Sequence, residues 1–397
     1  MGSDEIPYVK PYQQKMKLLY FCIQMDQVGG VARIESDKIN WLAAHGYDIT
    51  VYDIEDWEMQ PYYPLDARVR FMTAGIATTP GNPWVRLKGV VRAISRVRQI
   101  IREEQPDIIV NAHCPLVTWI LPFVTPHTPI VAEMHQSRQG LEVFDRQFMG
   151  RIGRWLHRWS VRWIYSQYDC FVCLTNEDLQ AWHLSNARAI PNFSSLGAEE
   201  TKARSHVDDG SRQIVVVARL APQKRIDLMM QIWQRLKPDF PDWHVKVLGD
   251  GFEADRLRAL CIEMGLESTF LMPGAVRDVR PELVASDILC LTSEYEGFGI
   301  VLIEAMQLGI PIMAFEYVGV HDIIRDGYDG YVVPFGDIDA YVSRLRQLMT
   351  SATERARLVT NAKQSVRKFD KEYVMQQWDT LFRTLRSDSS KLRHRER

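Results

Sequence analysis

The sequence predicts an α/β protein of two domains, each built on a parallel sheet with helices on both faces. The chain has 397 residues, which favours two domains of average size. Short, almost continuously apolar runs alternate with amphipathic helical patterns, as strands buried on both faces of a parallel sheet require. This alternation is interrupted by a polar stretch over residues 194–212 and then starts again.

The first series begins with a strand at Lys17–Ile23, a loop containing Gly29-Gly30 and a helix to about Ala44. Further strands are expected at 49–53, 108–110, 129–135 and 170–175, and residues 54–82 are expected to form a loop. A helix is predicted from Pro83 to about Glu104, since proline suits the first turn of a helix. A second helical pattern covers 137–167 and has a break near Gly150–Gly153.

The second series predicts strands at 214–217, 244–248, 269–272, 288–291, 312–314 and 330–333, with helices between them. We therefore expect a tail over 1–15, a first domain over 16–193, a linker over 194–212 and a second domain over 213–369. A last helix over 370–386 and a charged tail over 387–397 complete the predicted organisation.

Composition is that of an ordinary soluble globular protein, with 46% hydrophobic residues, 25% charged residues and a net charge of −2. No apolar run is long enough for a transmembrane helix, and the N-terminus lacks the pattern of a signal peptide. We expect a cytoplasmic protein, with peripheral attachment to the inner face of the membrane left open. Cys170 and Cys173 would point to opposite faces of a strand, so buried free thiols are expected rather than a disulfide.

The stretch Ser293–Met306 carries the strongest chemical signal. It comprises the end of a buried strand, a glycine-bearing loop and the first turns of a helix. The N–H groups of Gly299, Ile300 and Val301 would lie at the helix N-terminus, which favours an anion. Glu304, about a turn further on, suits a neutral diol better than a phosphate. An anion beside a diol indicates a nucleotide.

Arg219 and Lys224 supply a second signal. Both follow the buried strand at 214–217, where a parallel sheet presents its carboxyl edge. Arginine binds two oxygens at once and lysine adds a point charge, so the pair is suited to a diphosphate.

The string from Glu296 to Glu304, Glu-Gly-Phe-Gly-Ile-Val-Leu-Ile-Glu, resembles the signature of the retaining GT-B glycosyltransferases of family 4, the glycosyl transferases group 1. Arg219-Leu-x-x-x-Lys224 resembles the basic motif of the same family. The resemblance covers roughly residues 16–385 and is firmer in the second half. It implies two Rossmann-like domains that face each other across a cleft, with the donor bound mostly on the second.

The resemblance also implies roles for single residues. Glu304 would bind the ribose hydroxyls, and Arg219 with Lys224 would neutralise the leaving nucleoside diphosphate. Glu296 would hold a hydroxyl of the donor sugar, and His135 would approach that sugar from the opposite domain. The implied donor-binding residues are Gly29, Gly30, Arg219, Lys224, Glu296, Gly299, Ile300, Val301 and Glu304, and the implied catalytic residues are Glu296, His135, Arg219 and Lys224.

The sequence departs from the family pattern at three places. Arg225 stands where a glycine usually follows the lysine. Phe193 replaces the glycine of an Ile-Pro-Asn-Gly segment. Asp322 ends a segment that in relatives is often rich in glycine and ends in glutamate, which leaves the preference for the donor sugar open.

A basic, tryptophan-bearing stretch in the first half has no place in the donor site. Arg151, Arg154, Arg158 and Arg162 share a narrow stripe of the predicted helix, beside an apolar face that includes Trp155 and Trp159. Two readings stay open: a solvated charged face, or a face for an anionic membrane surface or an acceptor. A nucleic-acid partner is not expected, because the sequence contains no recognisable nucleic-acid-binding module.

We expect a retaining hexosyltransferase that uses a nucleotide sugar, UDP-sugar favoured over GDP-sugar, and a glycan or lipid-linked acceptor in bacterial surface polysaccharide synthesis. No metal is expected, since helix capping explains the Asp337-x-Asp339 spacing, and no cofactor, since the nucleotide sugar is a substrate. The ribose role of Glu304 leaves no obvious nucleophile, which favours front-face attack. The alternatives are a nucleotide-sugar epimerase of the same fold and a non-catalytic module that binds sugar nucleotide or membrane.

Overall fold

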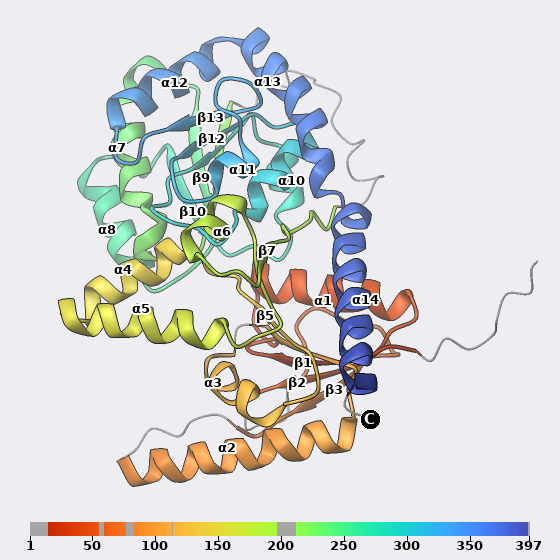
Figure 1. Ribbon diagram of the computed structural model, residues 1–397. Coiled ribbons are helices and arrows are strands. Elements are labelled where there is room, and N and C mark those ends of the chain that lie inside the picture. The colour runs from red at the N-terminus through yellow and green to blue at the C-terminus, as the bar shows by residue number, and fades with distance from the viewer. Residues whose placement is uncertain (1–14, 55–58, 77–82, 113, 197–211, 396–397) are drawn as a thin grey trace, which may run out of the picture. The chain divides into compact units, whose positions relative to one another are not determined.

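The computed structural model describes residues 15–54, 59–76, 83–112, 114–196 and 212–395. These residues form two compact units (Figure 1). Unit 1 holds the described residues of 1–133, 167–170 and 381–397, and unit 2 holds those of 134–166 and 171–380. Most of the predicted linker and almost all of the predicted N-terminal tail lie outside the described residues, and the predicted domain boundaries stay a prediction.

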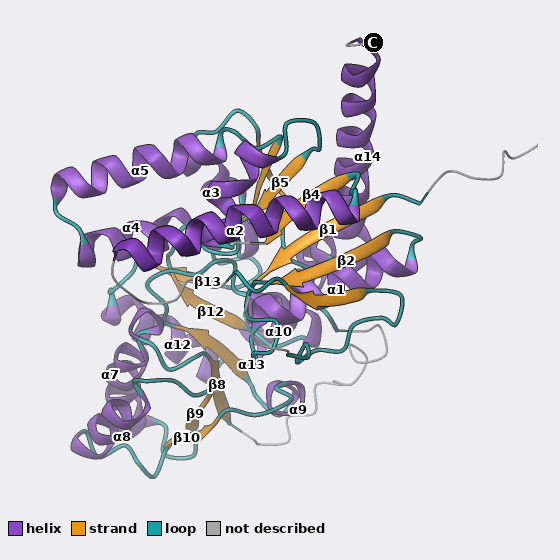
Figure 2. Cartoon of the chain, turned by 90° about the horizontal axis from the view of Figure 1, so that it is seen from below, coloured by secondary structure: helices purple, strands orange, loops and turns teal. Residues whose placement is uncertain are grey.

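Unit 1 is a parallel sheet with helices on both faces. Its strands run in the order β3-β2-β1-β4-β5. Helix α1 and the end of α14 cover one face, and α2 and α3 cover the other (Figures 1 and 2). Its elements are β1 (Lys17–Cys22), α1 (Gly30–Ala44), β2 (Asp48–Asp53), β3 (Arg70–Thr73), α2 (Pro83–Glu104), β4 (Ile108–Ala112), α3 (Pro115–Val124) and β5 (Ile130–Glu133).

Unit 2 contains a six-stranded parallel sheet in the order β10-β9-β8-β11-β12-β13 and the parallel pair β6–β7. The helix α14 (Lys371–Arg395) begins in unit 2 and ends in unit 1. The other elements are α4 (Arg138–Phe148), α5 (Arg151–Tyr165), β6 (Cys170–Cys173), α6 (Asn176–Trp182), β7 (Ala187–Ala189), β8 (Gln213–Val217), α7 (Ile226–Leu236), β9 (His244–Leu248), α8 (Ala254–Glu263), β10 (Phe270–Gly274), α9 (Arg280–Val284), β11 (Ile288–Leu291), α10 (Ile300–Leu308), β12 (Ile312–Phe315), α11 (Val320–Ile323), β13 (Tyr331–Val333), α12 (Ile338–Thr350) and α13 (Ala352–Ser365).

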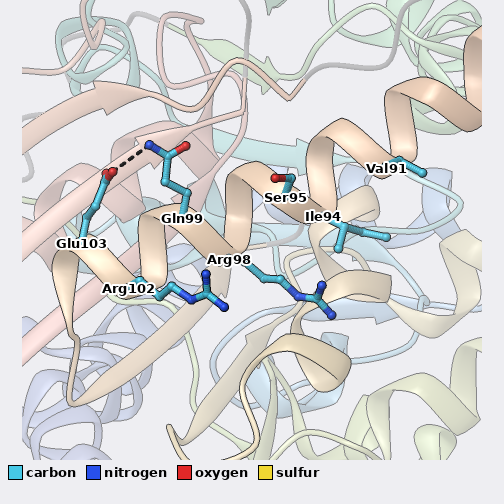
Figure 3. Close-up of a pocket in the computed structure, with 7 residues that line it drawn as sticks. All are labelled: Val91, Ile94, Ser95, Arg98, Gln99, Arg102 and Glu103. Atoms are coloured by element: carbon cyan, nitrogen blue, oxygen red, sulfur yellow. Dashed lines mark hydrogen bonds between the residues drawn. The ribbon is translucent and has the colours of Figure 1, made fainter.

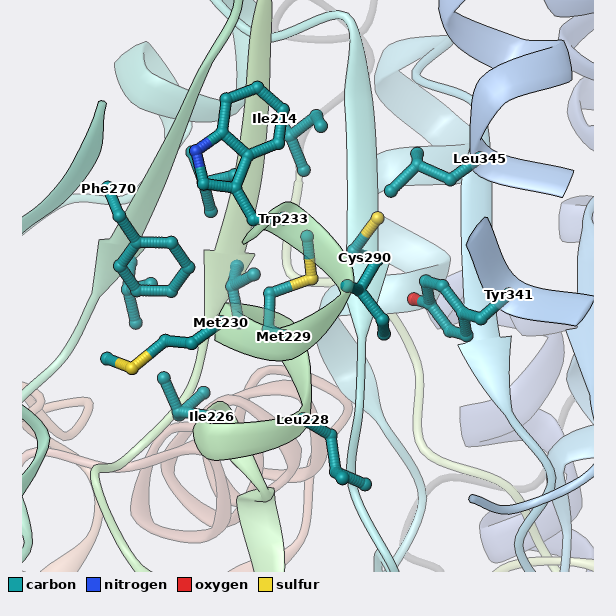
Figure 4. Packing of buried hydrophobic residues seen from close by; sticks show 14 of the residues in the cluster. Ile214, Ile226, Leu228, Met229, Met230, Trp233, Phe270, Cys290, Tyr341 and Leu345 are labelled. Carbon is teal, nitrogen blue, oxygen red and sulfur yellow. The ribbon is translucent and has the colours of Figure 1, made fainter. Parts of the chain in front are cut away.

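Two hydrophobic cores lie on the opposite faces of the six-stranded sheet, because successive side chains of each strand alternate between faces. Ile288 and Cys290 of β11 pack with α7, α8 and α12, where Trp233 and Tyr341 are fully buried (Figure 4). Leu289 of the same strand packs on the other face with α9, α10 and α11. The sheet is therefore buried on both sides, and its strand ends are held in fixed positions.

Several expectations are confirmed and others are corrected. The helical pattern over 137–167 is two helices, with the break at residues 149–150. All six cysteines are free and buried, and the Asp337 carboxylate caps α12 by accepting from the Ala340 N–H at 2.9 Å. The expected loop over 54–82 contains β3, an edge strand. Its side chains alternate between exposed and half-buried, so its sequence lacks the continuous apolar run that marks the buried strands. Helix α14 also continues past Arg386 to Arg395. Among the described residues, no helix is long and apolar enough to cross a membrane.

A buried charge cluster fastens α1 to β5 inside unit 1. Lys38 lies 2.8 Å from a Glu35 carboxylate oxygen and also forms an ion pair with Glu133, and all three side chains are almost fully buried. Burial lowers the pKa of Lys38, but attraction to Glu133 and Glu35 outweighs this and raises the pKa above its ordinary value. The ammonium group is therefore charged, and it screens two buried carboxylates from each other.

Replacing Lys38 by methionine should lower the free energy of unfolding by about 3–5 kcal/mol, because two buried carboxylates would lose their counter-charge. Urea unfolding of Lys38→Met would measure this, with Lys88→Met on the exposed surface of α2 as the matched control. A loss of less than about 1 kcal/mol, the range of an exposed ion pair, would contradict the buried-charge account.

Candidate functional site

The candidate site is built on the carboxyl ends of β8, β9 and β11, which lie side by side in the sheet of unit 2. The loop after β11 begins with Thr292 and Ser293 and leads into α10 at Gly299. Gly299 has φ +91°, in the left-handed region that glycine adopts without strain. A side-chain carbon at Gly299 would also lie 2.7 Å from the buried Tyr317 hydroxyl. Glycine at this position therefore lets the chain turn sharply into the helix.

Lys224 and Glu296 form the centre of the site. The Lys224 Nζ lies 2.6 and 2.7 Å from the two carboxylate oxygens of Glu296, and the Ser293 hydroxyl donates to the same carboxylate at 2.7 Å. The exposed fractions of the two charged side chains are only 17% and 11%. Hydrogen bonds to the backbone fix both partners, since the Thr292 hydroxyl donates to the Lys224 carbonyl at 3.0 Å and the Glu294 N–H donates to the Gln223 carbonyl at 2.8 Å. The structure thus brings together two residues that are 72 positions apart.

Arg219 follows β8, and its side chain is exposed. Its backbone is held by the neighbouring loop after β9: the Ala218 N–H donates to Leu248 at 3.0 Å, and the Leu220 N–H donates to Asp250 at 2.9 Å. The strand end therefore has a fixed position, while the guanidinium group can reach a ligand.

The departure at Arg225 has a conformational explanation. Arg225 has φ +49° and ψ +46°, a left-handed backbone that glycine adopts most easily. Its guanidinium group binds both carboxylate oxygens of Asp227, at 3.0 and 3.1 Å. This hydrogen bonding raises the pKa of Arg225, and the same contacts offset part of the cost of the backbone conformation. The family pattern favours glycine at this position. Arg225 occupies it without disrupting the turn after Lys224.

Gly297 explains how His135 comes to lie beside the Glu296 loop. A side-chain carbon at Gly297 would be 1.9 Å from the His135 carbonyl oxygen, which leaves room for glycine alone. His135 itself is buried, two residues beyond the end of β5. Both residues belong to unit 2, so the structure joins the predicted His135 to the predicted carboxylate loop.

Glu304 and the start of α10 complete the site. Glu304 is 3% exposed on the nine-residue helix α10. The N–H groups of Gly299, Ile300 and Val301 lie at the start of this helix, where backbone donors have no partners within the helix. The helix N-terminus thus offers donors and a partial positive charge to an anion. Gly29 and Gly30 belong to unit 1, where Gly30 is the first residue of α1.

The sequence did not reveal the polar contacts that fix these loops, although Asp322 itself was named as a departure from the family pattern. Gln139 of α4 donates to the Glu294 carbonyl at 3.1 Å and accepts from the Val318 N–H at 3.0 Å, so that it bridges the loops after β11 and β12. Asp322 accepts from the Asn176 side chain at 2.9 Å and from the Glu177 N–H at 3.0 Å, which places it at the start of α6. No local pattern points to these contacts, since the partners lie more than a hundred positions apart in the chain.

A surface hollow lies elsewhere, along α2 in unit 1. It is lined by residues of that helix alone, and Gln99 donates to Glu103 at 2.7 Å on its surface (Figure 3). The face of α2 that is fully buried carries Ala93, Val97 and Ile100. Ile94 is half-buried and lines the hollow. The hollow contains none of the predicted donor-binding residues.

The comparisons with known proteins agree with this architecture. The solved sucrose-phosphate synthase of Thermosynechococcus elongatus matches with a TM-score of 0.78 at 17% identity, covering 94% of this chain and 100% of that one. The Anabaena protein Alr3699/HepE, solved in complex with UDP-glucose, matches with a TM-score of 0.69 at 18% identity, covering 92% and 99%. These likenesses define the fold as GT-B, the two-domain α/β class of glycosyltransferases.

Two family models match the chain: "Glycosyl transferases group 1" over residues 197–365 and "Glycosyl transferase 4-like domain" over residues 29–192. The amylovoran biosynthesis glycosyltransferase AmsD of Erwinia amylovora is 24% identical over 375 residues, which cover 92% of this chain and 99% of that relative. This chain belongs to the group 1 glycosyl transferases.

Replacing Gly297 by alanine should cut turnover by about a hundredfold, because a shift of about 1 Å in a reacting group has an effect of this size. The added carbon overlaps the His135 carbonyl, so the loop that carries Glu296 must move. Steady-state kinetics would measure the loss, and Gly89→Ala, where an added carbon meets nothing within 4 Å, is the control. Unchanged kinetics in Gly297→Ala would show that the position of this loop does not matter for the reaction.

Proposed function

We propose that the chain is a retaining, metal-independent hexosyltransferase. It takes a hexose from a nucleotide sugar, with a UDP-sugar favoured, and passes it to a glycan or lipid-linked acceptor during synthesis of a bacterial surface polysaccharide. The UDP-glucose complex of HepE supports the choice of donor, and the role of AmsD in amylovoran biosynthesis supports the choice of pathway.

The observation that carries this proposal is the pairing of Lys224 with Glu296 beside the N-terminus of α10. Glu296 neutralises the lysine at distances of 2.6 and 2.7 Å. A bound diphosphate competes for the same ammonium group, which releases Glu296 to accept a hydrogen bond from a hydroxyl of the donor sugar. The pair is a preformed site for a ligand that joins an anion to a polyol.

Arg219 and the N–H groups at the start of α10 add to the positive potential. The guanidinium group of Arg219 can bind two phosphate oxygens through its planar pair of donors. The N–H groups at the start of α10 can bind phosphate oxygens through the backbone. Together with Lys224 they stabilise the charge that develops on the departing nucleoside diphosphate. This is the work that a divalent cation would otherwise do, so we propose that transfer proceeds without one.

Glu304 accounts for recognition of the nucleoside. It follows the anion-binding residues of α10 by about one helical turn, and a carboxylate can accept from both hydroxyls of a ribose. Because the carboxylate is buried, its replacement by a neutral group should weaken donor binding rather than only slow the reaction.

The stereochemical course follows from the roles of the two carboxylates. A double displacement needs a carboxylate nucleophile beside the anomeric carbon. Glu304 binds ribose, and Glu296 binds a sugar hydroxyl. We therefore propose front-face attack: the acceptor oxygen bonds to the anomeric carbon as the bond to phosphate breaks, and the acceptor proton passes to the departing phosphate oxygen. His135 lies beside the sugar and positions it.

The test is release of nucleoside diphosphate from UDP-, GDP- and ADP-sugars in EDTA, with products identified by NMR. Wild-type protein should release the nucleotide from one donor and give a product that keeps the anomeric configuration.

Glu304→Gln should raise the KM for that donor about tenfold or more, as expected for a lost hydrogen bond to a charged group. Glu296→Gln should lower kcat by about a hundredfold, the usual cost of one lost transition-state contact. Glu263→Gln on the exposed surface of α8 is the control.

Three outcomes would overturn the proposal. An altered sugar that stays attached to its nucleotide would identify an epimerase. An inverted product, or transfer that stops in EDTA, would exclude the proposed chemistry. Nucleotide binding without turnover in the presence of lipid-linked and glycan acceptors would identify a binding module.

A further inference from the structure

Helix α5 presents its apolar side to solvent, which reverses the usual orientation of a surface helix. Ile152 is 78% exposed, Trp155 66% and Trp159 60%. Leu156 and Trp163 are exposed as well, and the rings of Trp159 and Trp163 stack with centroids 6.4 Å apart. We call these five side chains, Ile152, Trp155, Leu156, Trp159 and Trp163, the α5 apolar face.

The spacing makes these residues one continuous surface. At about 100° per residue they fall within an arc of about 100° on the helix. Arg151, Arg154, Arg158 and Arg162 fall within the adjoining arc. A continuous exposed face with several large apolar side chains is unusual for a soluble protein and marks an interaction site.

Polar contacts hold α5 in this orientation. His157 lies 2.8 Å from the Asp145 carboxylate, which is 2% exposed. Arg158 lies 3.4 Å from Glu142 and 3.9 Å from Asp145. These contacts are all made with α4, which lies beside α5 in Figures 1 and 2. The polar side of α5 is therefore used for packing within unit 2, and a rotation that buried the tryptophans would break these contacts.

Charge identifies the partner of this face. Residues 138–165 contain six arginines against Glu142 and Asp145, which gives a net charge of +4 with histidine neutral, although the whole chain has a net charge of −2. Tryptophan favours the boundary between lipid and water, and each basic residue near an anionic bilayer strengthens binding about fivefold. Arginines beside exposed tryptophans on one helix are thus complementary to anionic lipid head groups above acyl chains.

We propose that α5 is a membrane-docking helix that lies in the surface of an anionic bilayer, with the α5 apolar face inserted among the upper acyl chains and the exposed Arg151 and Arg162 at the level of the phosphates. The helix has 15 residues and is about 22 Å long, so it lies along the surface and does not span the bilayer. The inference uses no residue of the donor site and is independent of the proposed reaction.

Sedimentation with vesicles tests this docking. Wild-type protein should bind vesicles of phosphatidylcholine with 30% phosphatidylglycerol at least about tenfold more tightly than vesicles of phosphatidylcholine alone, and high salt should weaken the binding. Trp155→Ser/Trp159→Ser should weaken binding to the anionic vesicles by about a hundredfold, since each aromatic side chain buried in the bilayer contributes about tenfold or more. Arg151→Gln should weaken it about fivefold.

The matched control is Ile262→Ser/Tyr373→Ser, which removes two exposed apolar side chains from α8 and α14. It should bind vesicles like the wild type. Thermal unfolding followed by circular dichroism should give the same Tm for all variants, because none of the replaced side chains is buried.

Quenching of tryptophan emission by lipids brominated in the acyl chains gives a second readout. Wild-type protein should be quenched, and Trp155→Ser/Trp159→Ser should lose most of the effect. Equal binding of the two proteins to anionic vesicles would overturn the proposal. So would absence of wild-type binding, or a dimer in analytical ultracentrifugation that the tryptophan variant dissociates, since the face would then be an interface between copies of the chain.

Discussion

The ion pair between Lys224 and Glu296 is the constraint on which the site depends. A lysine and a glutamate from distant parts of the chain meet with exposed fractions of 17% and 11%, where screening by water is weak. Their meeting requires β8 and β11 to be neighbours, as the strand order provides. It also requires the loop after β11 to turn sharply at Gly299. Once these conditions hold, a cation, a carboxylate and a helix N-terminus share one edge of the sheet.

The rest of unit 2 keeps this arrangement rigid. The two cores on either side of the sheet fix the strands, and the bridging side chain of Gln139 fixes the loops after β11 and β12. The close approach of Gly297 to the His135 carbonyl ties the carboxylate loop to the segment after β5. A site of this kind suits transfer chemistry, because preorganised charges cost no rearrangement when the leaving group departs. Helix α5, which we propose docks on a membrane surface, is a separate element of the same unit.

Much of the fold could be predicted from the sequence because the signals are local. Buried parallel strands such as Ile288–Leu291 are continuous apolar runs. The edge strand β3 was missed because none of its residues is fully buried, so its sequence is not a continuous apolar run. Glu296, Glu304, Arg219 and Lys224 were found by spacing and by family resemblance. The contacts of Gln139 and Asp322 could not be found in this way, since they depend on loops that meet only after folding. The outward orientation of the tryptophans on α5 was also not predictable, because periodicity gives the faces of a helix but not the direction in which they point.

The most direct test of the account is calorimetric titration of UDP against three proteins: wild type, Lys224→Met and Glu296→Gln. If Lys224 receives the diphosphate while Glu296 competes for the lysine, Lys224→Met should weaken UDP binding by about tenfold or more. Glu296→Gln should bind UDP as tightly as the wild type or more tightly, because the competing carboxylate is gone. Equal weakening in both variants would show that the pair acts only as a structural link. Unchanged affinity of Lys224→Met for UDP would show that the diphosphate does not bind at Lys224.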